Sequence, residues 1–413
     1  MSGGLASVLR NRDYRRLFGA QVIALLGTGM LTVALGLLAF DLAGADAGAV
    51  LGTALTIKMV AYVTVAPIVA AAVDRLPRKA VLIGADVLRA AMAVSLPFVT
   101  ETWQIYVIIF VLQSASATFT PAFQSTIPSI LTDERDYTKA LSLSRLAYDL
   151  EAIVSPIAAA ILLIVISYNN LFVATVAGFA ISAVLVALTA IPPRVMSTAT
   201  LSFWRRTSEG VRVFARTQSL RFLLLMNVVV AGATALVLVN SVVYVKSVFA
   251  LDDSALALTY AAYGIGSLLV ALNTPRIVDR IGVTRTMTLG AATIAFGLVA
   301  AVVCTVVATS GTDAWGVLLV VWAVLGAGTS LVNTPSARLL LAASTEQNRN
   351  LVYTAQFSLS HACFLITYPI AGWLGAADLT AAATVLLFLV VGAGVPAILV
   401  RRRIRCTTEV GAR

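Results

Sequence analysis

Ionisable side chains inside long apolar stretches are the residues of this sequence best suited to take part in chemistry. The richest stretch, 140–166, carries Arg145, Asp149 and Glu151. Arg145 and Asp149 are four residues apart, so on a helix they share a face and can form a salt bridge. Glu151 lies about 200° around that helix from Asp149 and cannot share its partner. A buried carboxyl without an ionic partner can bind a proton reversibly, so Glu151 is the first candidate proton carrier and Asp149 the second.

The alternative is that both acids are structural, paired with Arg145, Lys58 or neighbouring hydroxyl groups. Lys58 lies in another apolar stretch, and Tyr62 follows it one helical turn later on the same face. Such charges are functional candidates because burying them in a membrane costs free energy. Elsewhere Asp86 and Arg89 are three residues apart, and we expect them to form a local ion pair.

A polar stripe is predicted along the stretch 351–375. Helical spacing aligns its members on one side, where we expect them to face a central cavity: Tyr353, Gln356, Ser360, Cys363 and Thr367. His361 lies beside the stripe, as a packing residue or as a switch. With Cys363 it offers at most two soft ligands, fewer than a tight transition-metal site uses, so no metal site is expected. Further cavity candidates in other stretches are Gln21, Gln113, Asn227 and Asn240.

The composition places these residues in a membrane protein. Of 413 residues, 60% are hydrophobic and 12% are charged, whereas about a quarter are charged in soluble domains. The mean hydropathy is +0.95. Three scattered cysteines do not suggest a disulfide framework. The formal charge of +10 is explained by Lys and Arg retained on the cytoplasmic side, so we expect no nucleic-acid partner.

Membrane-spanning helices account for most of the chain. A bilayer core about 30 Å thick needs roughly 20 apolar residues per helix. Alternating ten-residue strands are absent, so the spans are helices and the fold class is an all-α membrane protein. Twelve spans are predicted, near 17–41, 49–72, 80–99, 103–127, 140–166, 171–191, 220–247, 255–275, 286–309, 314–340, 351–375 and 379–400.

The basic residues alternate between connections in a way that predicts orientation. Most Lys and Arg fall on the side of the N-terminus, while the opposite connections carry acids such as Asp46, Glu101 and Asp313. Both termini are therefore predicted to be cytoplasmic, in a bacterial inner membrane. The longest connection, 192–219, contains "LSFWRRTSEGVRVFAR". This segment is either an amphipathic helix on the inner membrane face or a linker that packs wherever the two halves allow.

A repeated motif indicates an internal duplication. "VDRLPRK" at 73–79 and "RIVDRIG" at 276–282 both follow an even-numbered span, and their Asp-Arg pairs are 205 residues apart. "TPAF" at 120–123 and "TPSA" at 334–337 form a second related pair. Duplicated halves are typical of secondary transporters. We therefore expect an N-terminal six-helix bundle at 1–191, a cytoplasmic linker with the amphipathic helix at 192–219, and a C-terminal bundle with a basic tail at 220–413.

With these features the sequence resembles the major facilitator superfamily over essentially its whole length. The family's loop signature is approximately G-x-L-a-D-R-x-G-R-K, and "AAAVDRLPRK" keeps Asp74, Arg75, Arg78 and Lys79. The resemblance implies two pseudo-symmetric bundles and alternating access. It also implies a gating role for this loop and its partner at Asp279 and Arg280. The carboxylate of Asp74 could bind a helix N-terminus or an arginine of the other half, whereas the bases could serve only to fix topology.

The fifth predicted span has a second resemblance, to the glycine-rich motif of antiporters in this superfamily. "SLSRLAYDLEAIVSPIAAA" at 142–160 has Ser155-Pro156 where that motif has Gly-Pro. This favours export. More loosely, the chain resembles the branch that contains nickel-resistance, macrolide-efflux and siderophore-export proteins. The chain has one histidine and lacks the histidine-rich tail typical of nickel-resistance members.

The predicted function is therefore export of a small molecule by alternating access, in antiport with protons. No Walker-type sequence is present to bind ATP, and we expect no enzyme activity, no cofactor and no metal. The expected partners are the substrate, protons and the lipid bilayer, and we expect a monomer. Two alternatives stay open at this point: uptake of an anionic small molecule, suggested by Lys58 and Arg89, and export of a metal or metal chelate.

Overall fold

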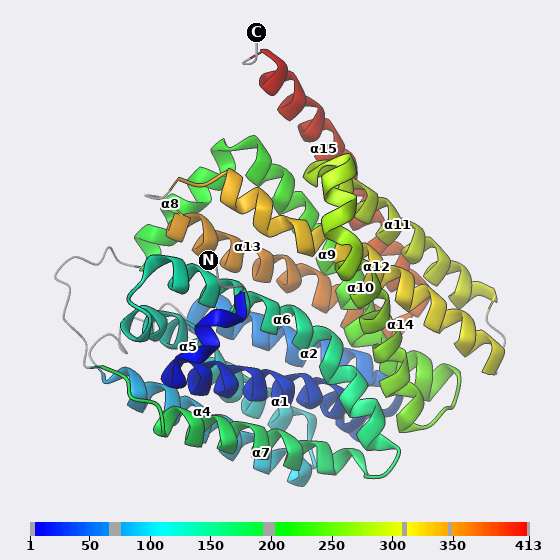
Figure 1. Cartoon of the computed structure of the whole chain (residues 1–413). Coiled ribbons are helices and arrows are strands. Elements are labelled where there is room, and N and C mark those ends of the chain that lie inside the picture. The colour runs from blue at the N-terminus through cyan, green and yellow to red at the C-terminus, as the bar shows by residue number, and fades with distance from the viewer. Residues whose placement is uncertain (1–4, 66–75, 193–202, 308–311, 346–348, 411–413) are drawn as a thin grey trace. The chain divides into compact units, whose positions relative to one another are not determined.

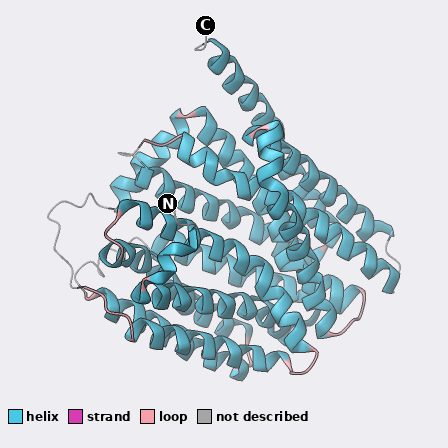
Figure 2. Ribbon diagram, in the orientation of Figure 1, coloured by secondary structure: helices cyan, strands magenta, loops and turns pink. Residues whose placement is uncertain are grey.

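The computed structural model describes residues 5–65, 76–192, 203–307, 312–345 and 349–410. These residues are helical apart from short connections, and none of them lies in a strand (Figures 1 and 2). The prediction of an all-α protein is confirmed.

The elements run in the following order along the chain, with α marking α-helices and η marking short 3₁₀- or π-helical segments. The N-terminal elements are η1 (Leu5–Arg10), α1 (Arg12–Ala43), η2 (Gly44–Asp46), α2 (Ala47–Val60), η3 (Ala61–Val65), α4 (Arg78–Ser95), η4 (Leu96–Phe98), α5 (Thr102–Ile130), α6 (Glu134–Leu163) and α7 (Tyr168–Ala187). The later elements are α8 (Phe203–Arg216), α9 (Gln218–Val242), η5 (Val243–Val248), α10 (Asp253–Ile281), α11 (Val283–Val307), α12 (Thr312–Ala342), α13 (Arg349–Pro369), η6 (Ile370–Leu374), α14 (Gly375–Ala377) and α15 (Leu379–Val410).

Ten stretches of the described residues are long and apolar enough to cross a membrane. The first, Arg12–Thr64, contains both α1 and α2. Helix α6 is not among the ten, and its sequence, ERDYTKALSLSRLAYDLEAIVSPIAAAILL, carries many charges. With 30 residues it is nevertheless about 45 Å long, enough to cross the hydrocarbon core.

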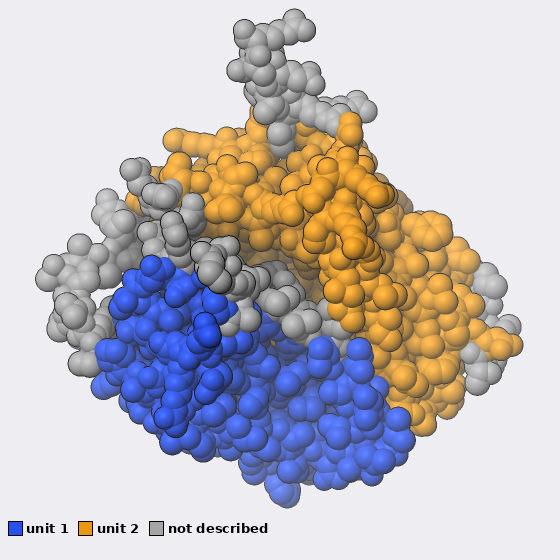
Figure 3. All heavy atoms as spheres, viewed as in Figure 1, with its two compact units in different colours: residues 1–38, 60–203 blue, residues 39–59, 204–413 orange. Residues whose placement is uncertain are grey.

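The chain forms two compact units (Figure 3). Unit 1 consists of Met1–Leu38 and Val60–Phe203, and unit 2 of Ala39–Met59 and Trp204–Arg413. The end of α1 and almost all of α2 thus pack with the C-terminal half of the chain. The predicted domain boundaries come from the duplication in the sequence. The two compact units are defined by packing, which is a different property of the chain.

Unit 1 is built around α4, which packs against α5 and α7. Its core buries aromatic and aliphatic side chains from several helices, among them Tyr14, Leu82, Phe123 and Val186. Small residues bring α1 and α7 together: the Thr175 hydroxyl donates to the Gly27 carbonyl oxygen at 3.0 Å. Close backbone packing of this kind is how helices associate where lipid removes the usual hydrophobic driving force.

Unit 2 is built around α9, which has 17 buried residues among its 25 and packs against α12, α13 and α15. The indole of Trp322 on α12 donates to the Ser241 hydroxyl on α9 at 2.7 Å. Helices α10 and α12 approach through glycines, because a Cβ added at Gly266 would lie 2.7 Å from the Cα of Ala323. These contacts hold the backbones of neighbouring helices close together.

Helix α8 falls in the predicted connection at 192–219 and belongs to unit 2 from Trp204 onward. Phe214 on its inner face is buried, while Arg212 and Arg216 are exposed. A Cβ at Gly210 would lie 2.7 Å from the carbonyl oxygen of Leu351 on α13. The segment therefore forms an amphipathic helix, and this helix also packs against α13.

Candidate functional site

The first predicted gating loop lies partly outside the described residues. Asp74 and Arg75 belong to the segment 66–75, which the structure does not describe. Arg78 begins α4 directly after Pro77. The ammonium group of Lys79 donates to the carbonyl oxygen of Thr189, just after α7, at 3.1 Å. The described part of the loop is thereby fastened to the end of α7 within unit 1.

The second loop forms an ion pair that the sequence did not indicate. Asp279, in the last turn of α10, accepts a hydrogen bond from Arg338 on α12 at 2.9 Å. Both side chains are more than half exposed. Arg338 directly follows the "TPSA" segment used to detect the repeat, but nothing in its spacing pointed to Asp279. Arg280 follows Asp279 directly and is the penultimate residue of α10, which ends at Ile281 before Gly282, where φ is +84°.

Asp86 and Arg89 form the predicted local ion pair, and both are almost fully buried on α4. Longer-range partners complete the arrangement: the Ser182 hydroxyl on α7 donates to the Asp86 carboxylate at 2.7 Å. The Arg89 guanidinium lies between two aromatic rings, 4.4 Å from the centroid of Phe119 and 4.6 Å from that of Phe179. The pair is therefore enclosed by α4, α5 and α7, where desolvated cation–π contacts are strong.

Glu151 on α6 lies against α1 at Gly29. Its carboxylate oxygen Oε1 is 2.9 Å from the position that a Cβ would take at Gly29. Ser155, one turn further along α6, is fully buried at the same contact. The other two charged residues predicted on this helix, Arg145 and Asp149, have side chains outside the described part.

Tyr148, on the same helix as this acid, connects it with polar groups of neighbouring helices. The Tyr148 hydroxyl, three residues before Glu151, is hydrogen-bonded to Thr120 of α5 at 3.2 Å, and the side chain of Gln21 on α1 lies near it. Tyr62 in η3 is close enough to Tyr148, Arg89 and Glu151 to interact with them electrostatically. The predicted candidates Gln21, Tyr62 and Glu151 are thus brought together in unit 1.

Two glutamines of unit 1 keep unused hydrogen-bonding capacity. The side-chain carbonyl oxygens of Gln21 and Gln113 are buried and have no hydrogen-bond donor among the described residues. A buried acceptor without a donor costs about 1–3 kcal/mol. Such oxygens are suitable points for a ligand or a water molecule to bind.

In unit 2 two of the predicted cavity residues are hydrogen-bonded to each other. The amides of Asn227 on α9 and Gln356 on α13 exchange two hydrogen bonds, each 3.1 Å long. Asn240, at the other end of α9, donates to the carbonyl oxygen of Ala371 in η6 at 2.9 Å. Sequence spacing placed these residues on suitable helices without revealing their partners.

The predicted stripe on α13 divides between several environments. Tyr353 is exposed, and the Ser360 hydroxyl donates to the Phe357 carbonyl oxygen at 3.0 Å. His361 Nδ1 lies 2.7 Å from that same carbonyl oxygen, and its ring packs on Phe357. Both of these contacts of His361 lie within α13 itself.

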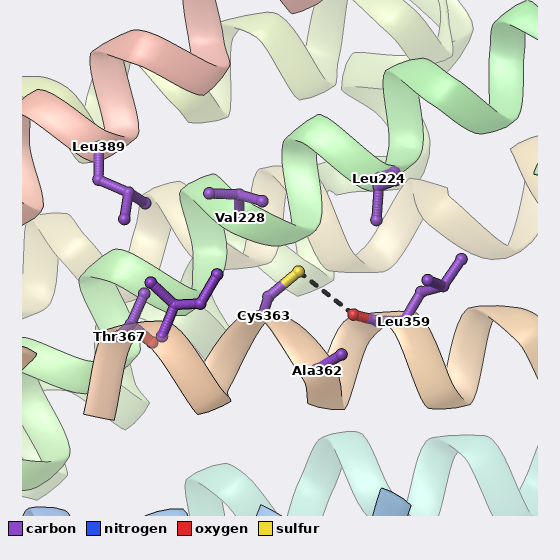
Figure 4. Close-up of a pocket in the computed structure, with 8 residues that line it drawn as sticks. Leu224, Val228, Leu359, Ala362, Cys363, Thr367 and Leu389 are labelled. Carbon is purple, nitrogen blue, oxygen red and sulfur yellow. Dashed lines mark hydrogen bonds between the residues drawn. The ribbon is translucent and has the colours of Figure 1, made fainter. Parts of the chain in front are cut away.

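The remaining stripe residues, Cys363 and Thr367, line an apolar cavity of about 180 Å³ in unit 2. Figure 4 shows it between α9 and α13, with Leu389 of α15 at one side. The Cys363 thiol donates to the Leu359 carbonyl oxygen at 3.2 Å. The polar stripe therefore faces α9 over this part of its length.

Sequence comparisons identify relatives of the chain. A family model described as Major Facilitator Superfamily matches residues 17–297 and again 223–408. Macrolide efflux protein A of Streptococcus pyogenes is 29% identical over 218 residues, covering 51% of this chain and 53% of that protein. Macrolide efflux protein A of Enterococcus faecalis is 30% identical over 189 residues, covering 43% of this chain and 58% of that protein. The chain thus spans about half the length of the curated relatives it matches.

Solved structures share the fold over almost the whole chain. The nucleoside transporter NupG superposes with a TM-score of 0.65 at 15% identity, covering 94% of this chain and 98% of that one. A POT family transporter in complex with 5-aminolevulinic acid gives a TM-score of 0.69 at 11% identity, covering 94% and 95%. At these identities the likeness establishes the fold alone. Together with the family match over both parts of the sequence, it shows that this chain belongs to the major facilitator superfamily of membrane transporters.

Proposed function

We propose that this transporter exports a small molecule by alternating access, in exchange for protons. The observation that carries the proposal is the position of Glu151, an acid on a helix in the membrane whose carboxylate packs against α1 beside Tyr148. Ionisable groups at such positions mark ion and proton pathways in transporters. The similarity to macrolide efflux protein A supports export.

Glu151 would be the proton carrier, with Asp149 as the second candidate. The substrate would bind near groups such as the side-chain carbonyl oxygens of Gln21 and Gln113, which have no hydrogen-bond donor among the described residues. The loops at 73–79 and 276–282 would control closure on the cytoplasmic side. The protein would lie in a bacterial inner membrane as a monomer with both termini in the cytoplasm.

The geometry gives less support to uptake of an anionic compound. That alternative relied on Lys58 and Arg89 as anion-binding groups. The Arg89 guanidinium is bound to the Asp86 carboxylate and enclosed between the rings of Phe119 and Phe179. An anion would have to displace a buried ionic partner, which costs several kcal/mol.

Transport in proteoliposomes tests the proposal. The protein is reconstituted in the inside-out orientation and tested with a panel of labelled compounds that includes macrolides. When a pH gradient is imposed, the vesicles should accumulate the true substrate. Glu151→Gln should abolish this accumulation, because the carboxyl can no longer exchange a proton. It should leave substrate exchange at equal pH intact.

Asp313→Asn, at the exposed start of α12, is the matched control and should transport as the wild type does. If Glu151→Gln retains full accumulation, the carboxyl of Glu151 is not the coupling group. If accumulation requires the opposite pH gradient, the protein imports its substrate.

A further inference from the structure

The contact between α1 and α6 is unusually close at one point, Gly29. An added Cβ there would overlap the side chain of Ser155 and would lie 2.9 Å from Glu151 Oε1. Only glycine leaves room for the buried Ser155 at this distance. By contrast, a Cβ at Gly19, on the same helix, would meet only the end of the Leu185 side chain, 3.6 Å away.

This contact has a chemical consequence because Glu151 takes part in it. The backbone of α1 at Gly29 covers one side of the Glu151 carboxylate and leaves no room for another group there. Ser155 fills the space beside Gly29, and its buried hydroxyl has no hydrogen-bond partner among the described residues. The degree to which the carboxyl is enclosed therefore depends on the spacing between α1 and α6.

The other titratable groups near Glu151 come from three elements. Tyr148 is on α6 itself and Tyr62 is in η3, and both interact electrostatically with the acid. Arg89 of α4 reaches the same two tyrosines, with its charge balanced by Asp86. The three atoms nearest to a Cβ added at Gly29 belong to Ser155 and Glu151 and to none of these groups. A change at Gly29 would thus act on Glu151 through packing.

We propose that Gly29 is a positioning residue for proton coupling: its missing side chain lets Ser155 and the Glu151 carboxyl pack on the α1 backbone, which sets the acid's proton affinity. This inference rests on the proposed function, because it assumes that Glu151 carries the proton. It adds that the α1–α6 spacing and the protonation of Glu151 are coupled. Movement of α1 away from α6 changes proton binding, and proton binding changes the preferred spacing.

The test exchanges volume across the contact. Gly29→Ala introduces a methyl group that overlaps Ser155, whereas Ser155→Gly removes the side chain opposite Gly29. In the double variant Gly29→Ala/Ser155→Gly, the new methyl group occupies the space that the serine has vacated. Gly19→Ala is the matched control on α1, since its methyl group makes only an ordinary contact.

Infrared difference spectra recorded against pH report the protonation of Glu151 without any substrate. The carboxyl band that disappears in Glu151→Gln is assigned to this residue in the full-length purified protein. Gly29→Ala and Ser155→Gly should each shift the midpoint of this band by about one pH unit, which corresponds to roughly 1.4 kcal/mol. The double variant should return to the wild-type midpoint, and Gly19→Ala should not leave it.

A general packing defect would lower stability, but the double variant would then not restore the wild-type midpoint. If Gly29→Ala fails to fold, Ser155→Gly, which introduces no overlap, and the double variant still decide the question. Wild-type midpoints in both single variants, or a double variant that keeps a shifted midpoint, would overturn the inference. The proposed function fails by a different result, namely gradient-driven transport by Glu151→Gln, which leaves the infrared outcome unaffected.

Discussion

At the scale of single residues, the buried charges of unit 1 differ sharply from the exposed charges of unit 2. Asp86 and Arg89 are buried, and they make further contacts with Ser182 and two aromatic rings. Asp279 and Arg338 make an equally direct ion pair at the surface. Removing one partner of a buried pair leaves an uncompensated charge, whereas water replaces a lost partner at the surface.

The two pairs should therefore respond differently to loss of the acid. Asp86→Asn should lower the free energy of unfolding by about 3–5 kcal/mol, because Arg89 is left charged and buried. Asp279→Asn should lower it by less than about 1 kcal/mol. Denaturant unfolding of the purified protein in detergent measures both. Equal losses in the two variants would contradict this account of Asp86.

The sequence predicted the Asp86–Arg89 pair because both partners lie within one helical turn. It could not predict Ser182, Phe119 or Phe179 as the remaining contacts, since these come from helices whose relative rotation depends on packing. The same reason explains Asn227 and Gln356. Each was predicted to face a cavity, but their mutual hydrogen bonds depend on how α13 is rotated against α9.

At the scale of elements, helix α10 has a capping acid that makes its stability depend on pH. The carboxylate of Asp252 accepts hydrogen bonds from the backbone N–H of Ala255 and the hydroxyl of Ser254. These bonds, the first above all, hold the pKa of Asp252 below its ordinary value of 3.8. A lowered pKa means that the cap stabilises the folded state above pH 3.8 and is lost as the pH falls through the lowered value.

Asp252→Ala should lower the free energy of unfolding by about 0.5–1 kcal/mol at pH 7, the lower part of the range for lost caps, because the residue is exposed. Thermal unfolding from pH 7 to pH 3 checks the dependence. The difference between wild type and variant should be constant down to about pH 4 and should then narrow. A difference that does not change with pH would show that the charge of Asp252 is unimportant for the cap.

Helices α10 and α12 depend on the absence of a side chain at Gly266. A Cβ there would overlap the Ala323 carbonyl group, and backbone of this kind does not yield as a flexible side chain would. Gly266→Ala should therefore lower the free energy of unfolding by about 1–3 kcal/mol through overpacking.

Gly392 on α15 provides the control, because a Cβ at this position would meet nothing within 4 Å. Gly392→Ala should leave stability unchanged or raise it by up to about 1 kcal/mol through helix propensity. Thermal melting in detergent compares the two. The packing argument fails if Gly266→Ala is as stable as Gly392→Ala.

At the scale of the whole molecule, composition and hydropathy were sufficient to predict an all-helical membrane protein. The repeated Asp-Arg loops carried the family resemblance, which the family match confirms. Helix α6 shows why hydropathy alone is insufficient to find every span. The charges of Arg145, Asp149 and Glu151, which make these residues functional candidates, also lower the hydropathy of the helix. The gating role of Asp74 stays a prediction, because residues 66–75 lie outside the described structure.

The division into units could not be predicted from the duplication. A repeat in sequence assigns all of α1 and α2 to the first half, yet residues 39–59 pack with unit 2. Their contacts depend on three glycines, Gly48, Gly52 and Gly372, whose backbones lie almost directly against each other. No periodicity in the sequence distinguishes such glycines from those that merely face lipid.

This packing has a consequence for the order in which the protein is assembled during synthesis. The indole of Trp373 donates to the Thr53 hydroxyl at 2.9 Å, across a separation of 320 residues. At translation rates of about 5–20 residues per second, the ribosome needs roughly 16–64 s to make the chain between them. The first hairpin must therefore enter the bilayer with Gly48 and Gly52 still uncovered. Until η6 emerges, lipid or the insertion machinery has to shield a surface that only the last tenth or so of the chain can complete.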